Sequence, residues 1–291
     1  MGDDGFGEIE VKIARTISEV RAAVGSARAN GTTIGFVPTM GFLHEGHLSL
    51  IDLARQDGCD FIVVSIFVNP TQFGPNEDLD RYPRDQARDV ELLEGRDVDL
   101  LFLPSAEEIY PRGFTTSVHV KGVADSLEGS RRPGHFDGVA TVVLKLFNIV
   151  QPDIAVFGQK DAQQCAVIAQ LVRDLDIAVK LLIGPTVREA DGLAMSSRNA
   201  YLAGPERQLA TALREALERG AETLARGASE ADEVQRSMRD GIAKHPGITV
   251  DYLELVDPTT FLPPADLNRA LLLVGAVRIG PTRLIDNIPV S

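Results

Sequence analysis

The sequence predicts an α/β protein, in which a doubly wound, mostly parallel sheet is followed by a small C-terminal α+β domain. Over the first two thirds of the chain, short apolar runs rich in β-branched residues alternate with amphipathic stretches. This alternation is typical of strand–helix–strand units around a parallel sheet. After about residue 187, two helical patterns are followed by three strand-like runs, and this order is typical of a separate layer with an antiparallel sheet.

Buried parallel strands are expected where short apolar runs are bounded by Gly, Pro, Asn or Asp. These runs are 33–39, 61–68, 98–103, 154–157 and 179–183. Helices are expected between them, at 44–56, 84–95, 138–150 and 161–174. Such a Rossmann-like sheet binds ligands at the carboxyl ends of its strands, so the polar residues that directly follow each strand are the candidates for a site.

The last third of the chain is expected to form the smaller domain. Two helices, at 204–227 and 229–245, precede three strands, at 248–255, 270–279 and 282–290. We therefore predict a Rossmann-like domain over residues 1–186 and an α+β domain over residues 187–291.

Composition and charge exclude several classes of protein. The chain has 291 residues, of which 44% are hydrophobic and 24% charged, as in an ordinary globular protein. A net charge of −13 argues against nonspecific binding to nucleic acid, which needs a basic surface. The two cysteines, Cys59 and Cys165, lie in apolar stretches and are interpreted as reduced core residues. No targeting or membrane segment is recognised, so we expect a cytoplasmic protein without a membrane partner.

Two histidines, His44 and His47, follow the first strand in the stretch "PTMGFLHEGHLSL". Three interpretations are open. A metal site is disfavoured, because zinc protease helices space their histidines at i and i+4 and no further ligand cluster accompanies this pair. Both side chains could instead be buried structural histidines. The third interpretation is an anion site, because the free N–H groups at the start of a helix attract phosphate and Gly41 and Gly46 allow close approach.

The same stretch resembles a known family. "HEGH" after "PTMG" is similar to the HIGH signature of the nucleotidylyl-transferase superfamily, and the longer stretch resembles the pantoate–β-alanine ligase family, the pantothenate synthetases. Further blocks resemble that family in the same order: "SIFVNPTQF", "DLDRYPR", "RPGHFDGVATVVLKLFNIVQPDIAVFGQKDAQQ", "PTVREADGLAMSSRN" and "DYLEL". Together they extend from about residue 35 to residue 288, which makes the resemblance specific.

The resemblance implies an ATP-dependent ligase that joins pantoate to β-alanine. Pantoate would first be adenylated, with release of pyrophosphate, and β-alanine would then displace AMP to give pantothenate. ATP would be a substrate, Mg²⁺ a cofactor, and a homodimer the state of assembly. Residues 1–186 would hold the nucleotide and pantoate, and the smaller domain would close over the active site.

Site residues follow from the same resemblance. The side chains implied to act on the transferring phosphate are His44, His47, Lys160, Ser196, Ser197 and Arg198. The residues implied to contact ATP are Met40, Gly41, Phe42, Leu43, His44, Glu45, Gly46, His47, Gly158, Gln159, Lys160, Asp161, Val187, Met195, Ser196, Ser197 and Arg198. Those implied to bind pantoate are Gln72, Gln164 and Asn69. Neutral amides suit this last task, because they bind hydroxyls and a carboxylate without adding charge.

Some positions depart from the family pattern. Gln159 stands where a glutamate is usual, and Ala162 replaces an aromatic residue. One acid of an adjacent pair is replaced by Arg88, which leaves Asp89 as the expected magnesium contact, with Asp85 one helical turn earlier. The loop "SRRPGHF" supplies Arg132 and His135, for which the resemblance implies a place near the site.

Other functions remain open at this point. An adenylyltransferase of the same superfamily, acting on a different small substrate, would use the same histidine pair, but its phosphate-ester substrate would call for cations rather than Gln72 and Gln164. A non-catalytic nucleotide-binding module would not need both histidines and the "SSR" loop. A tRNA synthetase is disfavoured, because no anticodon-binding domain or basic surface accompanies the signature.

Overall fold

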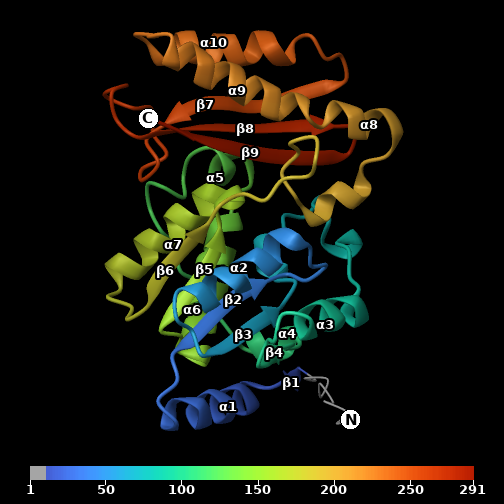
Figure 1. Cartoon of the computed structure of the whole chain (residues 1–291), viewed down its shortest axis with the longest axis vertical. Helices are drawn as coiled ribbons and strands as arrows, with labels where there is room; N and C mark the ends of the chain where they lie inside the picture. Colours follow the sequence, from blue (N-terminus) through green and yellow to red (C-terminus); the bar gives the residue numbers. More distant parts are fainter. Residues whose placement is uncertain (1–10) are drawn as a thin grey trace, which may run out of the picture.

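The computed structural model describes residues 11–291, which form two sheets (Figure 1). The larger sheet has six strands in the order β1-β4-β3-β2-β5-β6, and all its pairings are parallel. Its strands are β1 Lys12–Ala14, β2 Ile34–Thr39, β3 Phe61–Ile66, β4 Leu100–Phe102, β5 Ile154–Gly158 and β6 Lys180–Gly184. The chain order turns back between β2 and β5, and this is the switch point at which doubly wound sheets bind ligands.

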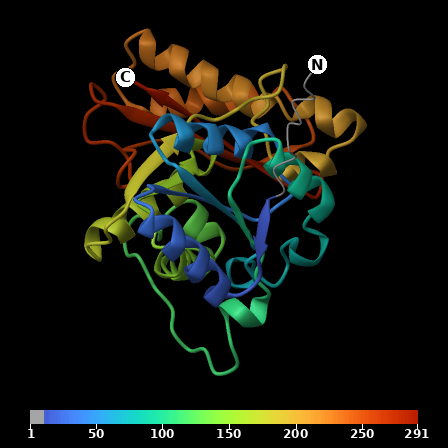
Figure 2. The same ribbon diagram turned by 60° about the horizontal axis from the view of Figure 1, so that its bottom comes forward.

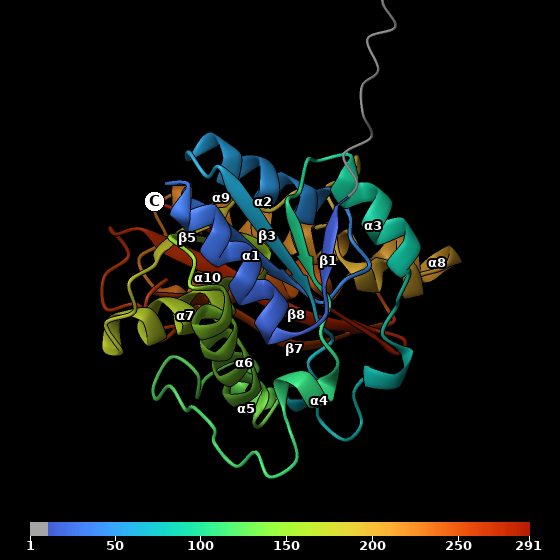
Figure 3. The ribbon, with the colours of Figure 1, turned by 90° about the horizontal axis from the view of Figure 1, so that it is seen from below.

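Helices cover both faces of this sheet (Figure 3). Their bounds are α1 Ile17–Ala29, α2 Glu45–Gln56, α3 Gln86–Glu94, α4 Ala106–Ile109, α5 Glu128–Arg131, α6 His135–Val150 and α7 Ala162–Asp174. Side chains of a strand alternate between the two faces. Phe36 and Val63 accordingly pack with α1, α6 and α7, whereas Val37 and Val64 pack with α2 and α3. Burial on both faces explains why the strands are continuous apolar runs.

The smaller sheet is antiparallel and is built by the C-terminal third of the chain. It consists of β7 Ile248–Val256, β8 Leu271–Ile279 and β9 Thr282–Val290, preceded by the helices α8 Gly204–Leu209, α9 Ala212–Ala225 and α10 Ala231–Ile242. Leu271 and Leu273 of β8 pack under α9 and α10, while Leu272 and Val274 join the core of the larger sheet. The central strand of the small sheet therefore connects the two cores.

The predicted fold class is confirmed, and the expected strands and most helix bounds lie within three residues of those observed. The boundary between residues 186 and 187 stays a prediction. One prediction was wrong: the helix expected over 204–227 is two helices, because the chain turns at Ala210 and Thr211 between α8 and α9.

The elements β1, α1, α4 and α5 were not expected at all. β1 has three residues, too few to show periodicity. The helix α1 did carry a readable signal, because Thr16 and Glu19 form the reciprocal capping box that marks a helix start. Between α4 and α5 the chain runs as a long extended loop that projects from the molecule (Figure 2). Among the helices built by residues 11–291, none is long and apolar enough to cross a membrane.

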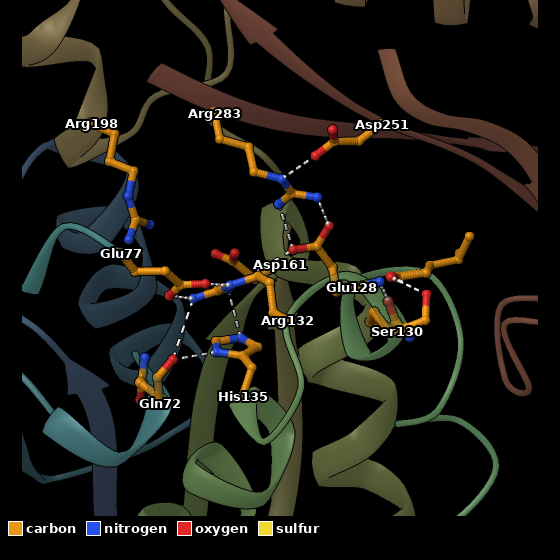
Figure 4. Close-up of polar contacts among 12 residues, drawn as sticks. Gln72, Glu77, Glu128, Ser130, Arg132, His135, Asp161, Arg198, Asp251 and Arg283 are labelled. Atoms are coloured by element: carbon orange, nitrogen blue, oxygen red, sulfur yellow. Dashed lines mark hydrogen bonds and ion pairs between the residues drawn. The ribbon is translucent and has the colours of Figure 1, made fainter. Parts of the chain in front are cut away.

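A buried ion-pair cluster joins helix α5 to the small sheet. Glu128 of α5 accepts hydrogen bonds from both terminal nitrogens of Arg283 in β9, at 2.7 and 2.6 Å, and one from the hydroxyl of Tyr252 at 2.7 Å (Figure 4). Arg283 also donates to Asp251 at 2.7 Å. Burial alone would raise the pKa of Glu128, but the hydrogen bonds and charge of Arg283, together with Tyr252 and Arg132, outweigh it and lower the pKa.

Removing this carboxylate should destabilise the protein strongly. We expect Glu128→Ala to lower the free energy of unfolding by about 3 kcal/mol, because it leaves part of a buried guanidinium without its partner. Glu222→Ala, which breaks the exposed pair between Glu222 and Arg226, is the matched control and should change that energy by at most about 0.5 kcal/mol. Urea unfolding of the three proteins measures both values, and equal midpoints for the two variants would contradict the assignment.

Candidate active site

The turn between β2 and α2 places the two histidines at the start of a helix. The chain leaves β2 through Gly41 and Phe42, both with positive φ, and α2 begins at Glu45 with His44 as its N-cap. Nδ1 of His44 accepts a hydrogen bond from the backbone N–H of Gly46 at 3.1 Å, and Nδ1 of His47 accepts from the N–H of His44 at 3.3 Å. The pair is thus a reciprocal cap, in which two of the free N–H groups of the helix are satisfied by imidazoles.

This cap determines where the ring protons lie. A ring nitrogen that accepts from an N–H cannot itself carry a proton, so each neutral ring of His44 and His47 is protonated at Nε2. Burial, and secondly Lys160, lower the pKa of His44 to about 4. Burial, and secondly His44, lower the pKa of His47 to about 3. Near pH 7 both rings are therefore neutral, and each offers one Nε2–H to a ligand.

The preceding loop is held by Asp89 and Arg88 of α3. The two oxygens of Asp89 accept from the backbone N–H groups of Phe42 and Leu43, at 2.8 and 2.7 Å. Arg88 donates to the carbonyl of Leu43 at 2.9 Å. Burial raises the pKa of Asp89, and the two backbone N–H groups oppose that rise. This acid–arginine pair therefore fixes the loop that leads into the histidine cap.

The surroundings of Asp89 do not fit a magnesium ligand. The residue is only 1% exposed, and both of its oxygens are engaged by backbone N–H groups. Within residues 11–291 no three His, Cys, Asp or Glu side chains gather in a way that could hold a metal ion. Asp85 caps α3 by accepting from the N–H of Arg88. A direct contact of Asp89 with magnesium remains an untested prediction that these hydrogen bonds disfavour.

Amide side chains follow β3. Asn69 is 1% exposed and donates to Oε1 of Gln72 at 3.1 Å and to the carbonyl of Gly138 at 3.1 Å. Its own oxygen accepts from the hydroxyl of Tyr110 at 2.9 Å. Gln72 in turn directs its Nε2 at the sulfur of Met40 at 3.2 Å. Asn69 therefore holds the side-chain amide of Gln72 in one orientation.

Arg132 and His135 hold the backbone of Gln72 (Figure 4). Arg132 donates to both oxygens of Glu77 at 2.7 Å and from Nη1 to Nε2 of His135 at 3.0 Å. Because a guanidinium only donates, Nε2 of His135 is the acceptor and Nδ1 carries the proton that is donated to the carbonyl of Gln72 at 2.9 Å. Burial, and secondly Arg132, lower the pKa of His135 to about 4.

The end of β5 contributes Lys160 and Asp161, which lie in a short 3₁₀ turn before α7. The ammonium of Lys160 is 3.8 Å from a carboxylate oxygen of Asp161. Asp161 is the N-cap of α7, but its side chain makes no capping hydrogen bond. Asn287 of β9 donates to the carbonyls of Gln159 and Lys160, at 2.9 and 3.1 Å.

The loop after residue 194 brings the last predicted group. Ser197 donates to the carbonyl of Phe42 at 3.1 Å, which connects this loop to the one that precedes the histidines. Arg198 forms two hydrogen bonds of 2.8 Å with the carboxylate of Asp78 and lies over the ring of Tyr82, 5.5 Å from its centroid. Its guanidinium is thus paired with an acid in this structure.

Two adjoining cavities collect these groups. A cavity of about 210 Å³ is lined by predicted residues that lie at or after the ends of β2, β3, β5 and β6 in the chain: Met40, His44, Gly46, His47, Asn69, Gln72, Gly158, Lys160, Asp161, Gln164, Val187, Met195, Ser196, Ser197 and Arg198. A neighbouring cavity of about 360 Å³ shares Arg132, Lys160, Asp161, Ser196 and Arg198 with it and reaches the small sheet. Because the same five residues line both, the two form one continuous site between the sheets.

The remaining predicted residues lie outside the cavity linings of the described chain. Leu43 is buried in the core under α2, and Glu45 pairs with Arg96 at the surface. Their assignment to ATP, with that of Gly41, Phe42 and Gln159, stays a prediction. Gln72 and Gln164 line the same cavity, but no hydrogen bond joins them among the described residues.

Several residues at this site were not found by sequence reasoning. They are Glu77, Asp78, Glu128, Arg283 and Asn287. Each acts through a partner more than 50 positions away in the chain, and such pairings leave no local pattern. The block "DLDRYPR" was recognised as family-like, and its first residue, Asp78, is the one signal that pointed to this group.

Comparisons with known proteins agree on one family. A family model described as pantoate-beta-alanine ligase matches residues 12–289. The chain is 52% identical over 278 residues to a pantothenate synthetase of Moorella thermoacetica, with 96% of this chain and 98% of the relative covered. It is 53% identical over 275 residues to that of Caldicellulosiruptor saccharolyticus, with 94% and 98% covered.

Solved structures give the same result. The crystal structure of pantothenate synthetase from Thermus thermophilus has a TM-score of 0.91 and 47% identity, over 96% of this chain and 99% of the other. A pantoate–β-alanine ligase from Francisella tularensis, solved in complex with beta-gamma ATP and β-alanine, has a TM-score of 0.78 and 38% identity, over 96% and 97% of the two chains.

The role of Asp89 can be tested directly. We expect Asp89→Asn to lower the free energy of unfolding by about 1–3 kcal/mol, because an amide can accept from only one of the two N–H groups of Phe42 and Leu43. The magnesium concentration for half-maximal activity should stay unchanged. Melting curves and magnesium titrations of the variant measure both. A raised magnesium requirement with unchanged stability would instead support a metal contact.

His135 should make the protein sensitive to acid. Its pKa is lowered to about 4 in the folded state, so the unfolded chain, with a pKa of about 6.5, takes up the proton first as the pH falls. Stability should therefore fall from about pH 6.5 downward until pH 4. His135→Gln keeps a donor and an acceptor but does not titrate, and should lose about 2 kcal/mol less than the wild type between pH 7 and pH 5. Parallel urea titrations at both pH values are the measurement, and equal losses would refute this.

Proposed function

The chain belongs to the pantoate–β-alanine ligase family, and we propose how its paired cavities perform the reaction of that family. The enzyme joins pantoate and β-alanine to form pantothenate, with ATP converted to AMP and pyrophosphate through a pantoyl adenylate. We assign the adenylation of pantoate and the attack of β-alanine to residues of these two cavities.

One observation carries the assignment of residues. The reciprocal cap fixes both neutral histidines with their protons on Nε2, in a cavity that they share with Lys160 and with the amides Gln72 and Gln164. Neutral N–H donors and one ammonium suit phosphate oxygens, and neutral amides suit a hydroxy acid. A phosphate-ester substrate would favour cations in the place of the two glutamines.

In the first step the carboxylate of pantoate attacks the α-phosphorus of ATP, and the bond to pyrophosphate breaks. Gln72 and Gln164, with Asn69 behind Gln72, orient pantoate for this attack. Nε2–H groups of His44 and His47 donate to the α-phosphate oxygens at the N-terminal end of α2, where the helix dipole also favours negative charge. Little covalent work falls to the protein in such a transfer.

Other predicted residues act on the departing pyrophosphate. Lys160 neutralises charge that develops on the leaving oxygens, and the hydroxyl of Ser196 donates a hydrogen bond to them. Ser197 can do the same only when its hydroxyl leaves the carbonyl of Phe42. Arg198 is paired with Asp78, so it can grip phosphate only when Asp78 shares or releases its guanidinium. In the second step the amine of β-alanine attacks the acyl carbon, loses a proton and expels AMP.

Finer expectations complete the proposal. Magnesium would arrive with ATP and keep phosphate and water ligands, because both oxygens of Asp89 are already engaged by backbone N–H groups. We further propose that residues 187–291 close over the bound substrates, that the enzyme works as a homodimer, and that it resides in the cytoplasm. These last points rest on the family resemblance.

The function and the histidine assignment can be tested together. The wild-type protein, incubated with ATP and pantoate, should release pyrophosphate, and AMP should appear in step with pantothenate once β-alanine is added. His44→Ala and His47→Ala should each slow single-turnover pyrophosphate release about a hundredfold, while calorimetric binding of pantoate changes little. Absence of pyrophosphate release by the wild type would contradict the function itself.

A matched variant separates catalysis from capping. Asparagine is a strong N-cap, so His44→Asn should retain the melting temperature but lack the Nε2–H, and its adenylation rate should fall like that of His44→Ala. A near wild-type rate for His44→Asn would show that position 44 only caps α2.

A further inference from the structure

The strand β9 brings two adjacent polar residues, Asp286 and Asn287, against the nucleotide side of the site. β9 is an edge strand of the small sheet and lies nearest to the larger one (Figure 1). Both residues are nearly fully buried, with 6% and 4% of their surface exposed. Neither was implicated by the sequence patterns, and neither takes part in the mechanism above.

All the polar atoms of the Asn287 side chain are used. Its Nδ2 donates both hydrogens, to the carbonyl of Gln159 at 2.9 Å and to that of Lys160 at 3.1 Å. Its Oδ1 accepts from Nε2 of Gln159 at 3.2 Å. The 3₁₀ turn at Gln159–Asp161 has no side-chain cap of its own. The amide of Asn287 therefore satisfies the two carbonyls of the turn that carries Lys160.

Asp286 pairs with a residue of the segment that follows β6. Its carboxylate accepts two hydrogen bonds from Arg188, at 2.7 and 2.9 Å, and one from the backbone N–H of Asn287 at 2.8 Å. Arg188 directly follows Val187, which lines the cavity. Adjacent residues of one strand thus hold the Lys160 turn and the segment after β6 at a fixed separation.

We propose that Asn287 is a positioning residue for adenylation, which acts by fixing the backbone of Lys160 so that its ammonium meets the phosphates of ATP. The inference rests on the function proposed above and adds to it a residue of the C-terminal sheet. It also gives Gln159 a task, because a glutamine at this position can donate to Oδ1 of Asn287 and a glutamate cannot.

Two variants remove the contact in different ways. Asn287→Leu has a similar size and no polar group, and Asn287→Asp keeps the shape but turns the two donors into acceptors. Both should raise the KM for ATP and slow single-turnover pyrophosphate release by at least roughly tenfold, since small misplacements of a reacting group are costly. The KM for pantoate and the reaction of preformed pantoyl adenylate with β-alanine should stay within about twofold, because Lys160 acts on the pyrophosphate that has already left.

A double-mutant cycle distinguishes positioning from a loss of stability. If Asn287 acts through Lys160, Asn287→Leu should have little further effect on pyrophosphate release in a Lys160→Ala background. Val277→Ala, which creates a cavity in the core of the small sheet, is the control. It should lower the melting temperature without changing the KM for ATP.

The outcomes separate this inference from the function on which it rests. Wild-type adenylation with unchanged ATP kinetics in both Asn287 variants would overturn the positioning role and leave the function intact. Additive effects of Asn287→Leu and Lys160→Ala would overturn it as well, and so would an effect confined to Asn287→Asp, since that would report the added charge. Failure of the wild type to form the adenylate would refute the function itself.

Discussion

The hydrogen bonds exchanged by His44 and His47 at the start of α2 are the contacts on which the site depends. They satisfy helix N–H groups that would otherwise be unpaired, and they place both ring protons on Nε2. Because burial lowers the pKa of each ring, the pair stays neutral. In the proposed mechanism, phosphate is therefore attracted by aimed N–H dipoles, the helix end and Lys160. Asp89 accepts a hydrogen bond from the N–H of Leu43, and Arg88 donates one to its carbonyl. These two bonds hold the backbone that leads into the histidine cap.

Around this centre the protein pairs its arginines with acids. Arg132 binds Glu77, Arg198 binds Asp78 and Arg283 binds Glu128. An acidic protein can therefore surround an anion site with guanidinium groups and keep them ordered before a ligand is present. Burying these charges costs desolvation free energy. This cost is offset by bidentate hydrogen bonds and, at Arg283, by the second acid, Asp251.

The small sheet contributes polar side chains to the site. Its strand β8 shares apolar side chains with both cores, and β9 supplies Arg283, Asp286 and Asn287 to the boundary. Through these contacts the C-terminal third of the chain sets the position of turns that follow β5 and β6. A change in the small sheet can therefore reach the part of the cavity lined by Lys160 without touching the parallel sheet.

The sequence by itself determined the fold class, most of the elements and the strand-end residues of the site. The fold class and the elements follow from apolar periodicity and turn residues. The strand-end residues follow from the resemblance of short motifs such as "HEGH" to those of the family, and each motif is contiguous because one strand–helix turn presents it. Only the tertiary structure decided which atoms of those residues are free. Both oxygens of Asp89 and the guanidinium of Arg198 are engaged by groups that the chain path brings close, whereas the Nδ1 atoms of the histidines are engaged by backbone N–H groups two and three positions away. Long-range pairings leave no periodicity in the sequence: Asn287 is 128 positions from Gln159, and Arg283 is 155 positions from Glu128. The reason is that the free energy of a hydrogen bond depends on distance in space and not along the chain.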